Sequence, residues 1–211
     1  GSVFVTSIAV YGTTRELFDD PKIAGVAAIW LNAMLLMSLA AMFATPDAPS
    51  TMFWALALWV IARLRSVELP RLWLLIGLLV GLGCVAKYTN LFMVPGILLW
   101  LALDPKARRW RFSLWTLMGG VVALLTFSPV LIWNASHGWI SFAKQFGRIA
   151  DRHPGFSYFG EFIVAQFGLL NPLIAIFATL AIYRWLRVPK SHLSKSVTFL
   201  ILLNGPLVVY M

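Results

Sequence analysis

Charged side chains are scarce in this chain, and acidic ones are scarcer than basic ones. Asp, Glu, Lys and Arg make up 12% of the 211 residues, with 8 acidic against 17 basic side chains, while 60% of the residues are hydrophobic. Soluble domains carry about 25% charged residues. The composition therefore excludes an ordinary soluble protein and predicts an integral membrane protein.

The chain also lacks the common catalytic and ligand-binding motifs. It has one cysteine, Cys84, which excludes an intrachain disulfide and suits a small buried side chain. No P-loop, dinucleotide-binding fingerprint, GxSxG, HExxH or paired Cys/His spacing occurs, and no internal repeat is evident. The sequence therefore predicts no cofactor and no metal site, and it gives no support to a divalent cation.

Long runs without any charge are abundant. A helix needs about 20 apolar residues to cross a hydrocarbon core of roughly 30 Å. Three charge-free runs meet this length: 23–46, 112–143 and 162–183. Five shorter ones occupy 1–14, 48–62, 72–86, 88–103 and 196–211. Apolar and polar residues do not alternate in these runs, so we expect an all-α bundle of transmembrane helices.

The basic residues are distributed unevenly between alternate loops. Suppose that 72–86 and 88–103 are two passes joined by a turn at "KYTN". One face of the membrane then holds 13 basic residues, in the loops 13–22, 63–71, 104–111 and 184–195. The opposite face holds three, with Lys87 set aside: Lys144, Arg148 and Arg152. A single helix over 72–103 would make the count eight against eight, so the excess of Lys and Arg in cytoplasmic loops selects two passes.

This topology predicts about eight spans, of which the first and last are truncated. The chain opens and closes inside apolar runs, so we expect residues 1–211 to be one partial domain of a longer protein. The basic loops "DPKARRWR" and "RWLRVPKSHLSK" are interpreted as topology determinants that meet anionic membrane lipids. The net charge of +9 is therefore not taken as a sign of nucleic-acid binding.

Lys87 is expected below the extracytoplasmic surface of the membrane. Helices over 72–86 and 88–103 would rise only about 22 Å and 24 Å, less than the hydrocarbon core. An ammonium group at that depth is costly unless it faces water or an anion, which predicts an intramembrane cavity. The alternative is a lysine that snorkels up to the lipid headgroups.

Asp47 lies between two prolines in "ATPDAPS", on the same side of the predicted membrane as Lys87. Pro49 suits the first turn of the helix that follows, and an aspartate before such a turn caps free backbone N–H groups. The second interpretation is an acidic group held rigidly at the mouth of the cavity. The two interpretations are compatible.

The segment 128–162 is the one long polar connection on that side. Lys144, Arg148 and Arg152 recur every four residues, which places them on one stripe of a helix near 139–152. This helix could lie at the membrane interface among anionic headgroups, or its stripe could face the cavity and bind a phosphate. His137 could orient an acceptor or be a bystander. "NAS" at 134–136 fits the glycosylation pattern, which often arises by chance.

Four stretches, taken in order, resemble a known family. They are "RELFDDPKIAGVAAIWL", "ATPDAPSTMFWALALW", "GLLVGLGCVAKYTNLFMVPGILLW" and "SPVLIWNASHGWISFAKQFGRIA". Together they resemble bacterial members of the dolichyl-phosphate-mannose protein mannosyltransferases, glycosyltransferase family 39-like enzymes of the GT-C superfamily. The resemblance covers roughly residues 15–172, and no single motif is specific alone.

The resemblance implies a membrane glycosyltransferase of the bacterial inner membrane, with its active site on the periplasmic side. Its partner would be a polyprenyl-phosphate-linked sugar, and the acceptor a lipid, glycan or protein. Asp47 matches the "TPDAP" aspartate, Lys87 the "KYT" lysine and Arg148 the "FGR" arginine. Asp47 is a candidate catalytic residue, and His137 is a candidate for orienting the acceptor. Candidates for binding the donor phosphate are Lys87, Tyr88, Lys144, Arg148 and Arg152.

The resemblance implies that the main catalytic base lies in the first extracytoplasmic loop, after the first transmembrane helix. We expect this chain to begin in the helix that follows that loop, and therefore to lack the base and to be inactive by itself. Two other classes remain open. A lipid or anion transporter, or flippase, would also use intramembrane charge and short helices. A non-catalytic membrane subunit is the third interpretation.

Overall fold

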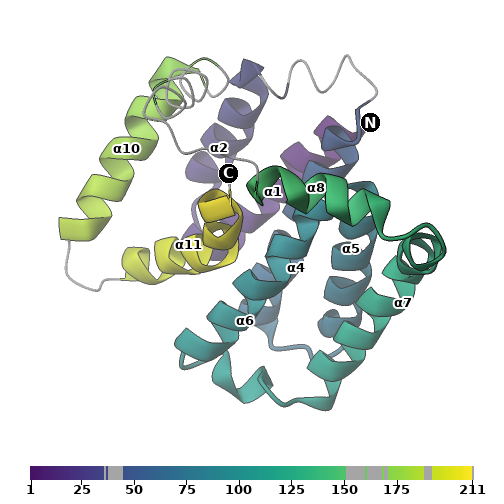
Figure 1. Ribbon diagram of the computed structural model, residues 1–211. Helices are drawn as coiled ribbons and strands as arrows, with labels where there is room; N and C mark the ends of the chain where they lie inside the picture. Colours follow the sequence, from purple (N-terminus) through teal and green to yellow (C-terminus); the bar gives the residue numbers. More distant parts are fainter. Residues whose placement is uncertain are drawn as a thin grey trace.

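The computed structural model describes residues 1–35, 37, 45–150, 160, 168, 171–187 and 192–210. All regular structure in these residues is helical, which confirms the all-α prediction (Figure 1). The elements are α1 Ser2–Phe18, α2 Pro21–Ala33, α4 Asp47–Val67, α5 Leu72–Ala86, η1 Tyr88–Phe92, α6 Met93–Leu103, η2 Arg108–Trp110, α7 Leu114–Ser136, α8 Ile140–Ala150, α10 Pro172–Arg187 and α11 His192–Tyr210, where η marks a 3-10 helix.

Local chemistry sets several helix ends. At the start of α2, Pro21 takes the first position and the Asp20 carboxylate accepts a hydrogen bond from the Lys22 N–H at 2.7 Å. Both α1 and α4 end at an acidic residue in the left-handed backbone conformation, Asp19 with φ 52° and Glu68 with φ 56°. These sharp ends allow neighbouring helices to pack antiparallel.

The predicted break between 72–86 and 88–103 is confirmed. Helix α5 ends at Ala86, and Lys87 has extended backbone angles, φ −158° and ψ 133°. The 3-10 helix η1 follows, and α6 then returns toward the end of the bundle where α5 began (Figure 1). A continuous helix over 72–103 is thereby excluded.

Three ion pairs connect the loops at that end, which we call the basic end: residues 13–22, 63–71 and 104–111. Arg63 on α4 pairs with Glu16 on α1 at 2.9 Å. Nη1 and Nη2 of Arg109 lie 2.8 and 2.5 Å from the two carboxylate oxygens of Glu68. A weaker pair joins Arg65 to Asp104 at 4.0 Å.

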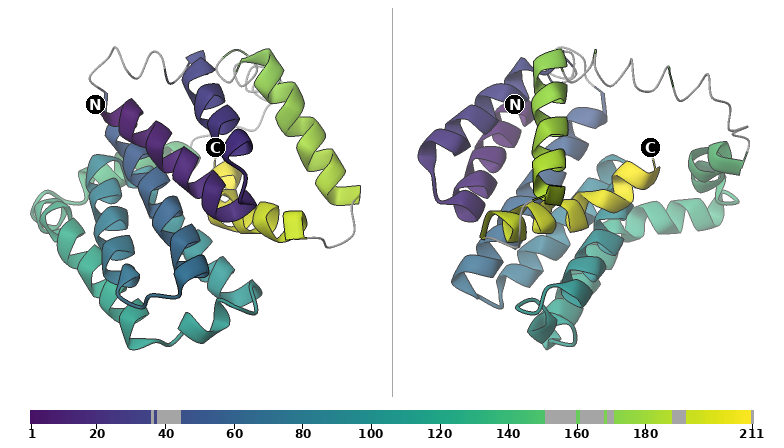
Figure 2. Two further views of the ribbon diagram at one scale, coloured as in Figure 1. Left: turned by 180° about the vertical axis from the view of Figure 1, so that it is seen from behind. Right: turned by 90° about the vertical axis from the view of Figure 1, so that its left-hand side faces the viewer.

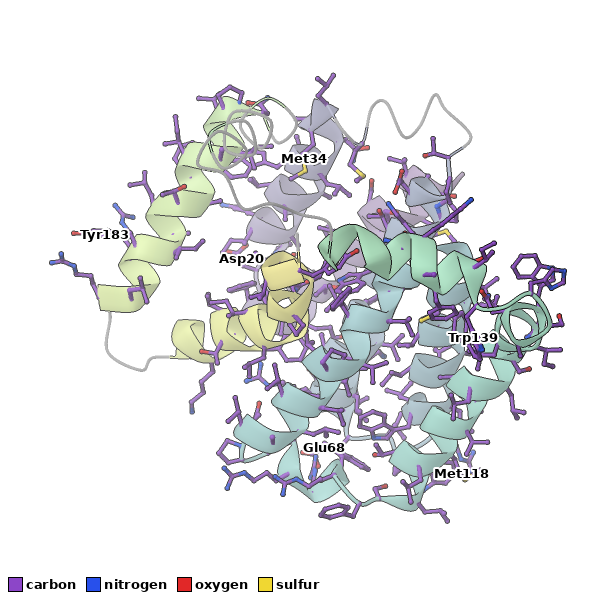
Figure 3. The ribbon with its side chains drawn as sticks, in the orientation of Figure 1. Asp20, Met34, Glu68, Met118, Trp139 and Tyr183 are labelled. Carbon is purple, nitrogen blue, oxygen red and sulfur yellow. The ribbon has the colours of Figure 1, made fainter. Side chains whose placement is uncertain are left out.

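The start of α11 also lies at the basic end. The buried Ser196 hydroxyl donates to the Leu17 carbonyl at 2.8 Å, and the Arg65 guanidinium lies 5.7 Å from the centre of the Phe199 ring. The loops 13–22, 63–71 and 104–111 therefore gather with the start of α11 at one end of the bundle. Residues 188–191 of the fourth loop, 184–195, lie outside the described residues, so its place stays a prediction. In Figure 3, Glu68 lies at the bottom of the view, whereas Asp20 of the loop 13–22 lies at mid-height.

The core of the bundle is formed by α4, α5, α6, α7 and α11. Helix α5 packs between α4 and α7, α1 packs on α4 and α2, and α11 packs on α6. Figure 2 shows α1 beside α4 and α11 running across the bundle. The largest side chains with almost no exposure include Ile61, Trp100 and Phe199.

Glycine allows α5 and α7 to approach closely. A Cβ added at Gly77 would collide with the carbonyl of Gly119, and one added at Gly81 would lie 2.6 Å from Thr126. Small residues four positions apart are a common feature of helix contacts in membranes, where close backbone packing replaces the hydrophobic driving force. The α5–α7 contact follows this pattern.

The outer face of α7 is apolar and exposed, as expected for a helix that contacts lipid. Leu117, Val121 and Leu124 are exposed on it, whereas Gly119 and Phe127 are buried. Within the part of the chain that the structure describes, α7 is the one helix long and apolar enough to cross a membrane by length and composition. The count of about eight spans stays a prediction. The runs 23–46 and 162–183 lie partly outside the described residues.

We expect Gly77→Ala to lower the free energy of unfolding by about 1–3 kcal/mol, because the new methyl group meets backbone that cannot move aside. Gly120→Ala is the matched control, since nothing lies within 4 Å of a Cβ added at this neighbouring, exposed glycine. Thermal unfolding of the purified full-length protein in detergent would compare the two. Equal stabilities would contradict the close α5–α7 contact.

The Glu68–Arg109 pair predicts a pH-dependent contribution to stability. The hydrogen bond from Arg109 lowers the pKa of Glu68 below its ordinary value of 4.5 and raises the pKa of Arg109. A lowered carboxylate pKa stabilises the fold above pH 4.5, and this stabilisation is lost as the pH falls through the lowered value. We expect Glu68→Gln to lower the melting temperature slightly at pH 7 and the difference to vanish at acidic pH. A difference that is constant with pH would contradict the pairing.

Candidate functional site

The end of the bundle opposite the basic end brings two predicted site residues together. The Lys87 ammonium, at the break after α5, forms an ion pair with the Asp47 carboxylate at the start of α4. Their side chains are 38% and 51% exposed, so neither charge is buried in the described residues. The two residues are separated by 40 positions in the sequence, and only the packing of α4 on α5 makes them neighbours.

The prediction that Asp47 caps a helix is wrong. Helix α4 begins at Asp47 itself, Pro46 precedes it, and no side chain makes a capping hydrogen bond there. The carboxylate bonds to Lys87 instead, although its place in the first turn also favours the helix dipole. Pro49 lies in that first turn, as predicted.

Two buried polar residues lie next to the ion pair, and the sequence analysis missed both. The Asn90 amide donates to the Ser50 hydroxyl at 2.5 Å. Ser50 is 7% exposed and Asn90 3% exposed. The signal was present in the sequence, because each is a polar residue beside a predicted site residue and within an otherwise apolar stretch.

Tyr88 connects the helix break to α7 and α8. Its ring stacks on Phe142 of α8, with the ring centres 4.8 Å apart and an angle of 16° between the planes. It also meets Phe127 edge-on at 6.3 Å. The Asn134 amide lies 3.3 Å from the Tyr88 hydroxyl and donates to it. Asn134 is fully buried, so this fold excludes glycosylation at the "NAS" pattern of residues 134–136.

Helix α8 confirms the prediction of a helix near 139–152 as far as Ala150. Trp139 lies at the turn from α7 into α8 (Figure 3), and Gln145 of α8 donates to the Tyr210 hydroxyl of α11 at 3.3 Å. Lys144 is exposed on α8. The Arg148 side chain and the whole of Arg152 lie outside the described residues, so the basic stripe stays a prediction.

His137 is not brought to the ion pair by any contact within the described residues. It is exposed just after α7, where its ring stacks on Trp133 with the centres 4.1 Å apart. Its Nδ1 lies 2.8 Å from the Trp133 carbonyl and 3.0 Å from the Ser136 hydroxyl. These contacts are all with its own turn, and a role toward an acceptor stays a prediction.

The described ranges contain no group of three or more His, Cys, Asp or Glu side chains arranged to hold a metal ion. What the site does offer is a lysine cation beside a carboxylate, with a tyrosine at the next position. An ammonium group in such a place can bind a phosphate, because charge-assisted hydrogen bonds to phosphate are about twice as strong as neutral ones.

We expect Asp47 and Lys87 to behave as a coupled pair. In a double-mutant cycle with Asp47→Asn and Lys87→Gln, the double variant should be about as stable as either single variant, because each single change already breaks the pair. The coupling should be small, roughly 0.2–1 kcal/mol, since both side chains are partly exposed. Chemical unfolding of the full-length protein in detergent would measure it. Fully additive losses would contradict the contact.

Comparison with known proteins agrees with the resemblance seen in the sequence. The family described as dolichyl-phosphate-mannose-protein mannosyltransferase matches residues 2–133. The chain is 28% identical over 204 residues to the lipid A galacturonosyltransferase RgtD of Rhizobium johnstonii, a match that covers 94% of this chain and 42% of the relative. This chain thus spans about two fifths of that relative's length. No solved structure matches this chain. Because the family match extends over more than half of the chain, the chain belongs to the dolichyl-phosphate-mannose-protein mannosyltransferase family.

Proposed function

We propose that the chain is part of a membrane glycosyltransferase that moves a sugar from a polyprenyl-phosphate carrier to a lipid, glycan or protein. The observation that carries this proposal is the Lys87–Asp47 pair at the break between α5 and η1. Membership of the family supports glycosyl transfer. The name of the Rhizobium johnstonii relative describes a galacturonosyltransferase acting on lipid A, which supports a lipid as acceptor.

We assign the reaction to the extracytoplasmic side of the membrane. The basic end gathers the loops that are richest in Lys and Arg, and such loops remain in the cytoplasm. The ion pair lies at the opposite end, which this assignment places at the outer, periplasmic face of a bacterial inner membrane. A carrier with a polyprenyl chain would reach that face from within the lipid.

The leaving phosphate needs the most help from the protein. An acceptor oxygen attacks the anomeric carbon while the bond from that carbon to the phosphate oxygen breaks, and its electron pair stays on the phosphate. A positive group already in place lowers the cost of this growing negative charge, and one such group contributes several kcal/mol in a site that excludes water. Lys87 is assigned this role, and Asp47 is assigned the role of orienting it.

The acceptor proton must pass to a carboxylate. Asp47 is engaged with Lys87, which suits an orienting role better than that of a base. The family resemblance places the main base in a loop before the matched segments, so we assign proton transfer to that loop. Four further residues are assigned to the donor phosphate, namely Tyr88, Lys144, Arg148 and Arg152, and His137 is assigned to the acceptor.

We expect Lys87→Ala in the full-length enzyme to lower kcat about a hundredfold, the typical cost of removing one preorganised group that stabilises a developing anion. The assay is transfer of labelled sugar from a polyprenyl-phosphate donor to extracted membrane lipid. Lys106→Ala is the control, because Lys106 is exposed at the basic end. Both variants should fold, and Lys87→Ala should lose only the small stabilisation of its pair with Asp47.

Unchanged turnover in Lys87→Ala would refute the role given to this lysine. A different result would replace the function altogether. Suppose that the purified protein moved the polyprenyl-phosphate sugar across the membrane of lipid vesicles and transferred no sugar to an acceptor. The transporter interpretation would then hold instead.

A further inference from the structure

Ser50 and Asn90 have no role in the function proposed above, yet they form a buried polar contact directly next to the Lys87–Asp47 pair. We infer that they are positioning residues, which hold the backbone of Lys87 so that its ammonium group meets both Asp47 and the donor phosphate. The inference rests on the proposed function. It names two residues that act through Lys87 and have no contact with the reacting atoms.

The hydrogen bonds of Asn90 connect both members of the ion pair. Its side-chain amide donates to Ser50 at 2.5 Å, and its backbone N–H donates to the Lys87 carbonyl at 3.0 Å. The same amide lies 3.4 Å from that carbonyl. Ser50 follows Asp47 by three residues in the first turns of α4, so one amide ties the start of α4 to the residue that carries the ammonium group.

Lys87 needs such a fixed backbone because it belongs to no helix. Its N–H still bonds to the Gly83 carbonyl at 2.9 Å, whereas its own carbonyl points into the turn and depends on Asn90. A lysine side chain has four flexible methylene groups and about 2 kcal/mol of rotamer entropy. Holding its base in place reduces the number of positions that the ammonium can take.

The Asn90 side-chain amide is tightly enclosed by its neighbours. A Cβ added at Gly83 would lie 2.5 Å from the Asn90 side-chain oxygen. The backbone of α5 therefore closes one side of the amide while Ser50 closes another. Both residues are buried. Removing Ser50 takes away the shorter of the two hydrogen bonds that the Asn90 amide donates, and removing Asn90 leaves the Ser50 hydroxyl without this donor in an apolar surrounding.

The test compares Ser50→Ala and Asn90→Ala with two controls in the full-length enzyme. Ser196→Ala also removes a buried serine that makes a 2.8 Å bond between helices, but at the basic end. Asn204→Ala removes an asparagine whose oxygen accepts from the Trp54 indole at 2.8 Å, again between two helices. Each variant is assayed for kcat, for KM of the polyprenyl-phosphate sugar and for melting temperature.

We expect kcat to fall roughly tenfold or more in Ser50→Ala and Asn90→Ala, because misplacing a catalytic group by about an ångström has effects of this size or larger. KM should change less, since Lys87 acts mainly on the transition state. The double variant should be no slower than the worse single one. Ser50→Thr, which keeps the hydroxyl, should restore kcat, and the controls should lose only melting temperature.

The inference is overturned if Ser50→Ala and Asn90→Ala keep the kcat of the wild type, or lose no more of it than their controls at equal melting temperature. Lys87→Ala separates this failure from that of the proposed function. An inactive Lys87→Ala beside fully active Ser50→Ala rejects the positioning role alone, whereas an active Lys87→Ala rejects the function on which it rests. Should Asn90→Ala not fold, Ser50→Ala and Ser50→Thr decide the question.

Discussion

The interruption of the helix at Lys87 is the constraint on which the rest of the structure depends. Because α5 stops there, α6 returns to the end where α5 began, and the loop 104–111 meets the loop 63–71 through Arg109 and Glu68. The same interruption leaves Lys87 at the other end, within reach of Asp47. A continuous helix over 72–103 would have carried the loop 104–111 to the opposite end of the bundle.

The two ends of the bundle are held by different kinds of interaction. Exposed ion pairs connect the loops of the basic end, and such pairs contribute little to stability in water. These ion pairs therefore show which loops lie together, but they contribute little to holding the loops in place. The opposite end instead uses the buried Ser50–Asn90 contact and the stacking of Tyr88 on Phe142. Buried polar contacts are directional, which suits a site that must present one cation accurately.

Much of this arrangement could be predicted from the sequence, because its signals are local. Charge-free runs marked the helices, and the count of basic residues selected two passes over 72–103, with the break at Lys87. The capping role of Asp47 was wrong for a physical reason. An N-cap is recognised from neighbouring residues, whereas Lys87, the partner that binds the Asp47 carboxylate, lies 40 positions away. The burial of Asn134 could not be predicted either, because a three-residue pattern carries no information about burial.

The sequence by itself determined the helical class, the turn at "KYTN" and the grouping of the loops 13–22, 63–71 and 104–111 at one end, since hydrophobicity and charge act residue by residue. Only the tertiary structure decided which side chains meet. Gly77 and Gly119 allow α5 to pack closely against α7, and α4 packs on the other side of α5. That packing brings Ser50 to Asn90 and Asp47 to Lys87, because contacts between distant residues depend on how helices are placed relative to one another.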